Sequence, residues 1–128
     1  MLRQSFLLYG FQTTDLKEIA KKVGTALGVC FEERESMYQR GDYFYWRDSS
    51  THQECKIKRN FWEWAESDDD LWAEPSYMEF PMIMYVVESP GSSILEEKIS
   101  QTLSDFAYLL RKNILVVKED EYADDDDE

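Results

Sequence analysis

The spacing of apolar residues at the start of the chain predicts a strand followed by a helix. Arg3–Phe11 is rich in Leu, Tyr and Phe, which is typical of a β-strand. From Leu16 onward apolar residues recur at helical spacing and form one face. Asp15 and Glu18 have the spacing of a capping box, and Gly28 supplies a left-handed end. We therefore expect a helix between Asp15 and Gly28.

The next stretch predicts a meander of short strands. From Val29 the pattern changes to a shorter alternation, and a turn precedes the aromatic strand Tyr43–Trp46. A second turn leads into His52–Asn60, where Cys55 and Ile57 alternate with lysines. This alternation predicts strands with one solvent-exposed face.

The central part of the chain predicts a long loop and then a buried strand. Trp62–Pro81 has no stable period, and so long a loop in a small domain is usually functional or mobile. Met82–Val87 is a continuous apolar run, as expected of a strand in the middle of a sheet.

The last part predicts a second helix and a final strand. Ser93 and Glu96 form another capping box. Asn113 ends the predicted helix, and Ile114–Val117 is a short strand. The apolar residues expected along the helix are Ile99, Leu103, Phe106 and Leu110.

The order β-α-β-β-β-β-α-β predicts an α+β fold, in which a mainly antiparallel sheet of five to six strands carries two helices on one face. If the first and last strands share the sheet, the fold is a variation on a split β-α-β arrangement. We expect one domain over residues 1–118 and an acidic disordered tail over residues 119–128.

The charge balance narrows the classes of partner. The chain has 14 Lys and Arg against 27 Asp and Glu, and its formal net charge is −13. The tail carries eight of these acids, so the body alone has a charge of −5. A protein this acidic repels nucleic-acid phosphates and anionic lipid, so we expect no direct binding to nucleic acid or membrane. No apolar run suits a membrane span or a signal peptide, and we expect a cytoplasmic protein.

No constellation of catalytic residues can be assembled, and we expect a protein that is not an enzyme and needs no cofactor or metal. His52 is the single histidine, which excludes histidine relays and multi-histidine metal sites. Cys30 and Cys55 are expected to be half-buried thiols. The run Asp68–Asp70 lacks the ligand spacing of a calcium loop.

An enzymatic alternative would rest on carboxylates alone. Its candidates are Glu32, Glu35 and Asp42. Turnover that is abolished by alanine at one of them would support it.

Acidic and aromatic residues alternate in the predicted loop. No Lys or Arg occurs between Asn60 and Glu97. Rings that exclude water, surrounded by charges that speed association, are typical of a binding surface, and the complement of this one is a basic protein. The alternative is that Trp62 and Trp64 are core residues covering an end of the sheet. The candidate partner-binding residues are Trp62, Glu63, Trp64, Glu66, Asp68, Asp69, Asp70, Trp72 and Glu74.

Several segments together resemble a small bacterial immunity protein, of the type found beside polymorphic toxins and contact-dependent growth-inhibition systems. The resemblance spans roughly Leu7–Val87, about two-thirds of the chain. The segments that carry it are Leu7–Phe11, Leu27–Tyr38, Gly41–Phe44 and Phe80-Pro81 ahead of Met82–Val87.

The resemblance implies stoichiometric binding to the C-terminal domain of a cognate toxin, in the cytoplasm and without a cofactor. Together with the acidity, it predicts that the toxin is a basic nuclease held by steric and electrostatic block. The alternative is an acidic regulatory adaptor or nucleic-acid mimic that occupies a basic host protein. Gene position separates the two, because an immunity gene lies directly downstream of its toxin gene.

Overall fold

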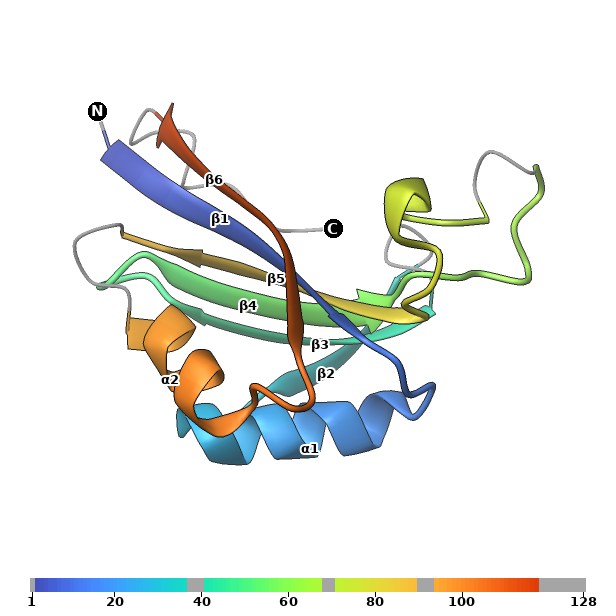
Figure 1. Cartoon of the computed structure of the whole chain (residues 1–128), viewed down its shortest axis with the longest axis horizontal. Coiled ribbons are helices and arrows are strands. Elements are labelled where there is room, and N and C mark those ends of the chain that lie inside the picture. Colours follow the sequence, from blue (N-terminus) through green and yellow to red (C-terminus); the bar gives the residue numbers. More distant parts are fainter. Residues whose placement is uncertain (1, 37–40, 68–70, 90–93, 118–128) are drawn as a thin grey trace.

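A single antiparallel sheet with two helices on one face forms the fold (Figure 1), which confirms the predicted class and element order. The computed structural model describes residues 2–36, 41–67, 71–89 and 94–117. The elements are β1 (Leu2–Phe11), α1 (Leu16–Leu27), β2 (Glu32–Ser36), β3 (Gly41–Asp48), β4 (Gln53–Arg59), a short 3₁₀ helix (Pro75–Tyr77), β5 (Met82–Glu88), α2 (Ile94–Thr102) and β6 (Tyr108–Val117).

The sheet has six strands in the order β2-β3-β4-β5-β1-β6. The first strand therefore lies between β5 and β6, with antiparallel neighbours on both sides. The first and last strands share the sheet, and β2 and β6 form its two edges. As predicted, Met82–Val87 lies within a strand in the middle of the sheet.

Helix α1 begins and ends where the sequence predicts. The Asp15 carboxylate accepts a hydrogen bond from the Glu18 N–H at 3.1 Å. Gly28 ends the helix with φ of 71°, in the left-handed region that favours glycine. The apolar face of α1 packs with α2 on the sheet, and burial of this shared core drives the two layers together. Core residues from the sheet include Leu7, Tyr9, Phe11, Cys55, Ile57, Met82, Met84 and Val86.

The predicted end of the second helix is wrong. The helix was expected to include Leu110 and to end at Asn113, but α2 ends at Thr102 and β6 begins at Tyr108. In the register of the sheet, Tyr108 and Leu109 pair with β1. Without them this part of β1 would have an unpaired edge, so tertiary pairing overrides the local helical pattern.

A buried carboxylate caps α2. Glu88 at the end of β5 is fully buried and accepts hydrogen bonds from the N–H groups of Leu95 and Glu96, each at 2.9 Å. Burial raises the pKa of Glu88, and the two backbone hydrogen bonds oppose that rise. Ser93, the predicted capping residue, lies outside the described residues.

The face of the sheet away from the helices is less exposed than predicted. Tyr43 and Tyr45 of β3 are buried on this face. Arg34 lies over the Tyr45 ring at 4.5 Å, and Lys56 lies 6.0 Å from both tyrosine rings. The stems and charges of these cations cover the rings, so the face is a layer of aromatic and cationic side chains.

The cysteines also differ from the prediction of two half-buried thiols. Cys55 is fully buried and Cys30 is exposed. Strand β2 begins at Glu32 instead of near Val29, so Cys30 precedes it and takes no part in its alternation. Burial raises the pKa of the Cys55 thiol.

Within the described residues, no helix is long and apolar enough to cross a membrane. The predicted acidic tail at residues 119–128 lies outside the described residues.

Candidate functional site

Residues 60–67 and 71–81, between β4 and β5, are the described part of a loop, numbered 60–81, that projects from one end of the sheet (Figure 1). We call this segment the 60–81 loop. Backbone hydrogen bonds close its base: the Trp62 N–H donates to Leu71 O and the Ala73 N–H donates to Asn60 O, each at 2.8 Å. The loop therefore leaves the sheet and returns to it as a closed unit.

Asn60 anchors the loop from inside. It is fully buried, and its Oδ1 accepts from the Glu74 N–H at 2.7 Å. Its Nδ2 donates to the carbonyl oxygens of Tyr77, at 3.1 Å, and Phe80, at 2.9 Å. One side chain thus satisfies three backbone groups of a segment that has little regular structure of its own.

A second anchor joins the loop to the sheet. The Glu74 carboxylate accepts a hydrogen bond from the Tyr85 hydroxyl. It also forms an ion pair with Arg111 of β6, whose Nη1 lies 3.2 Å from Oε1. Both carboxylate oxygens are therefore engaged within the chain. Glu74, predicted as a partner-binding residue, holds the loop in place.

Some aromatic side chains of the loop pack against neighbouring residues, and others are exposed to solvent. Trp72 is half-buried, and its ring lies 4.9 Å from the Phe61 ring. Trp62 is also half-buried and lies against Gly41, where a Cβ atom would be 3.2 Å from the indole ring. Trp64, in contrast, is 69% exposed. Trp62 therefore packs against the sheet, whereas Trp64 is exposed to solvent and is not a core residue.

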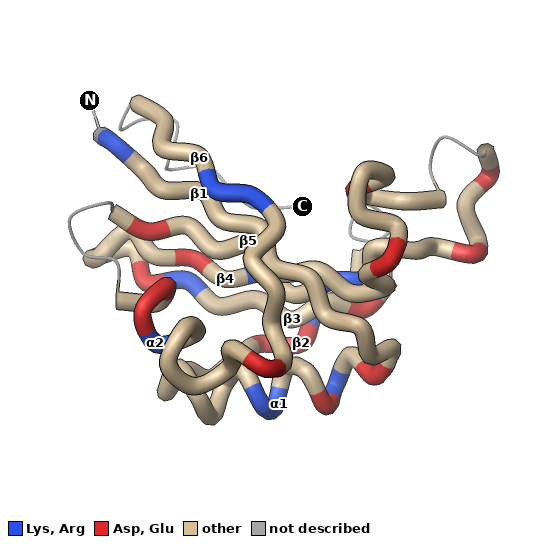
Figure 2. The backbone as a smooth tube through the Cα atoms, viewed as in Figure 1, with Lys and Arg blue, Asp and Glu red and all other residues tan. Residues whose placement is uncertain are grey.

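The loop also exposes acidic side chains close in sequence to these rings. Glu63 and Glu66 are exposed. The described part of the loop carries acids and no Lys or Arg (Figure 2). Asp68, Asp69 and Asp70, also predicted as partner-binding residues, lie outside the described residues.

A pocket of about 470 Å³ lies where the loop meets the ends of β2 and β3. Trp62 and Trp64 supply apolar walls, and Glu35, Asp42 and Glu63 supply carboxylates. One cation, Arg59, also lines the pocket, and its Nη1 donates to the Asp42 backbone oxygen at 3.2 Å.

Two of these carboxylates lie in an unfavourable arrangement. Glu35 and Asp42 are direct partners in the antiparallel register of β2 and β3. Like charges opposite each other destabilise a sheet. Arg59, which lines the same pocket, offsets part of this repulsion, and a further cation that entered the pocket would offset more of it.

The carboxylates of the enzymatic alternative are not brought together. Glu35 and Asp42 share one face of the sheet, whereas Glu32 pairs with Tyr45 on the other face and forms an ion pair with Arg34 at 2.7 Å. In the described ranges, no group of three His, Cys, Asp or Glu residues could hold a metal ion.

Two residues that shape the site, Asn60 and Arg59, were not predicted from the sequence. Asn60 looks like an ordinary polar residue at the end of a strand, where an Asn side chain is expected to bond backbone groups only a few residues away. Arg59 belongs to an alternating strand and gives no separate signal. Both act through residues that are distant in the sequence.

No protein-family model matches the chain, and no curated protein is found that is similar to it.

Proposed function

We propose that this protein is an immunity protein that binds a cationic toxin domain, most simply a nuclease, and blocks it through the 60–81 loop. The observation that carries the proposal is Trp64, a 69% exposed indole beside a pocket lined by Glu35, Asp42 and Glu63. Isolated exposed apolar residues are common, but a large ring at a carboxylate-lined pocket is the arrangement of a binding anchor.

The chemistry of the pocket favours a Lys or Arg side chain of the partner. Its apolar stem would lie on Trp62 and Trp64, and its charge would face three carboxylates, which outnumber the single cation of the lining, Arg59. The exposed Glu63 and Glu66, in a chain of net charge −13, would steer a basic protein toward this surface.

The loop anchors support a binding role because they order the surface before a partner arrives. Asn60 and Glu74 fix the loop backbone on the sheet. A preorganised surface loses less conformational freedom on association, so more of the contact energy contributes to affinity.

Co-expression with the product of the adjacent upstream gene tests the proposal. We expect the protein to restore growth of cells that express that product, and to co-purify with it in equal amounts. Trp64→Ala should weaken both results, whereas Met78→Ala, which removes another exposed apolar side chain of the loop, should leave them intact. Absence of rescue and of co-purification would reject the immunity function. Capture of a basic host protein instead would favour the regulatory alternative.

A further inference from the structure

Strand β6 leaves one edge of the sheet open. It is ten residues long. Within the part of the chain that the structure describes, it pairs only with β1. An edge strand of this length offers a row of N–H and C=O groups to another strand.

The open edge also carries most of the exposed large apolar side chains among the described residues. Of the nine large apolar side chains that are exposed among the described residues, five belong to β6. Ile114, Leu115 and Val116 are consecutive and are 45%, 53% and 58% exposed. Natural proteins rarely leave a long apolar edge uncovered, because it recruits other strands.

The opposite edge is built differently. Strand β2 has five residues with the sequence Glu-Glu-Arg-Glu-Ser, and most of them are exposed. A short edge with charged side chains resists pairing. The sheet can therefore extend at one edge only, which gives a closed pair and not a fibre.

We propose that β6 pairs with β6 of a second copy of this chain, antiparallel and around a two-fold axis near Leu115. The two sheets then form one continuous sheet of twelve strands, twice the six of one chain. Such an interface is isologous, as in most homodimers.

The side chains of β6 are self-complementary in this arrangement. The register with β1 places Ile114 and Val116 on the face that the helices cover and Leu115 on the other face. A two-fold axis perpendicular to the sheet keeps each face continuous across the pair. Ile114 then lies opposite Val116 of the second copy, and the two Leu115 side chains meet at the axis. Because β6 ends at Val117, the pairing uses residues 113–117 of each strand.

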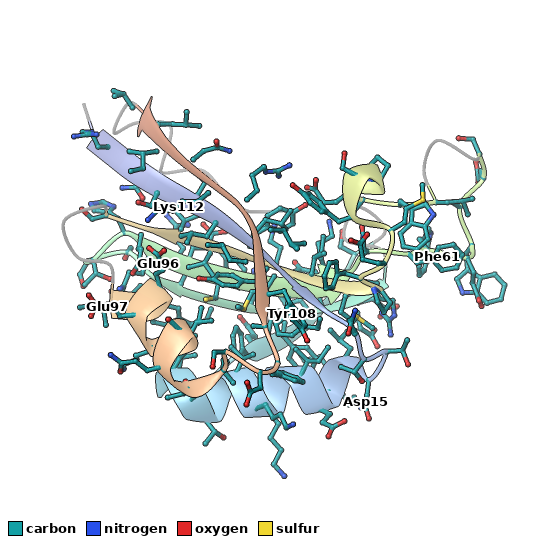
Figure 3. All side chains as sticks on the ribbon, viewed as in Figure 1. Asp15, Phe61, Glu96, Glu97, Tyr108 and Lys112 are labelled. Carbon is teal, nitrogen blue, oxygen red and sulfur yellow. The ribbon has the colours of Figure 1, made fainter. Side chains whose placement is uncertain are left out.

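The cations of β6 do not oppose this contact. Arg111 is paired with Glu74, and Lys112 lies 3.1 Å from the Glu96 carboxylate of α2 (Figure 3). The charge that does oppose pairing is the net −13 of each chain. Salt screens that repulsion, so dimerisation should strengthen as ionic strength rises. Binding of a cationic toxin should weaken under the same change.

The loop contacts the first half of β6, through Glu74 and Arg111, and the paired residues 113–117 lie at the other end of the strand. In Figure 1 the C-terminal end of β6 is at the upper left, and the 60–81 loop projects to the right. The dimer therefore leaves the 60–81 loop accessible to a partner. The dimer proposal does not depend on the proposed function.

Sedimentation velocity over a wide range of protein concentration tests the proposal. We expect a concentration-dependent species of twice the chain mass, more abundant at higher salt. The double variant Ile114→Lys/Val116→Lys should raise the dimer dissociation constant at least about tenfold, or about 1.4 kcal/mol. Both positions are about half exposed in the single chain, so the variant should fold. The matched control Met78→Lys/Ile94→Lys changes two equally exposed apolar residues elsewhere and should leave the dimer intact.

A charge-complementation experiment tests the register. Ile114→Lys/Val116→Lys mixed with Ile114→Glu/Val116→Glu should restore a mixed dimer, because each Lys then faces a Glu. A single-chain mass at all concentrations would overturn the proposal, as would a dimer that survives the lysine variant or weakens with salt. Failure of the mixed dimer would overturn the register around Leu115. None of these results bears on whether the 60–81 loop binds a toxin.

Discussion

Arg111 of β6 binds Glu74 of the 60–81 loop through two hydrogen bonds, of 3.2 and 3.3 Å. The pair joins residues 37 positions apart and ties the projecting loop to the sheet. The Glu74 carboxylate thus fixes the position of the loop, and with it the position of the other acidic residues of the loop.

Arg111→Ala should loosen the loop without unfolding the domain. The pair is partly exposed, so we expect a loss of about 0.5–1 kcal/mol in the free energy of unfolding. Hydrogen exchange at the amides of residues 72–77 should become faster. Arg34→Ala, which removes the Arg34–Glu32 pair on β2, is the matched control and should leave these amides protected. Equal protection in both variants would mean that the Arg111–Glu74 pair does not hold the loop.

Asn60→Ala should cost more, about 2–4 kcal/mol in the free energy of unfolding, because it leaves buried backbone groups without partners. The groups affected are the Glu74 N–H and the carbonyl oxygens of Tyr77 and Phe80. Urea denaturation measures the loss. Asn113→Ala, at an exposed position of β6, should stay within about 0.5 kcal/mol of the unmodified protein. A small effect at Asn60 would contradict its role as the anchor.

Gly10→Ala should destabilise the contact between the loop and β1. A Cβ atom at Gly10 would lie 2.5 Å from the Phe80 ring and 2.9 Å from Leu110. We expect a loss of about 1–3 kcal/mol, the usual cost of overpacking. Phe80→Leu makes room, so the double variant should lose less than the sum of the two single variants. Additive losses would show that the ring does not limit this position.

Glu88 should make stability depend on pH. Burial raises its pKa in the folded protein above the ordinary value of 4.5, so the folded state binds this proton more tightly than the unfolded chain does. The contribution is fully present below the ordinary pKa and is lost as pH rises through the raised one. The free energy of unfolding should therefore fall across this range, and less so in Glu88→Gln. Subtracting the two denaturation curves cancels the general repulsion among acids; a flat difference would contradict the shift.

The local signals in the sequence were sufficient for most of the fold. Asp15 and Gly28 define α1 through interactions within a few residues, and the apolar run at Met82 gives the central strand. The end of α2 was not predictable in this way. Phe106 and Leu110 continue the helical spacing, and only the pairing of Tyr108 and Leu109 with β1 places this segment in a strand.

The sequence indicated which residue types the loop contains, but not which of its side chains are packed and which are exposed. Alternating rings and acids predict that the 60–81 loop is a surface for a basic partner, and this stays a prediction. Which residues face outward depends on distant contacts. Glu74 is engaged by Tyr85 and Arg111, and Trp62 lies against Gly41, whereas Trp64 stays exposed. The two residues of each pair are too far apart in the sequence for a local pattern to predict their contact.

The most direct test of the central claim is the association rate between this protein and the product of the adjacent upstream gene, measured by stopped flow at several ionic strengths. We expect the rate to fall as salt rises, and Glu63→Lys/Glu66→Lys to reduce it about tenfold or more at low salt. Glu18→Lys/Glu97→Lys reverses the same number of exposed acids on the helices and should have a much smaller effect. Equal association rates for the loop variant and the unmodified protein would contradict the claim that the 60–81 loop captures a cationic partner.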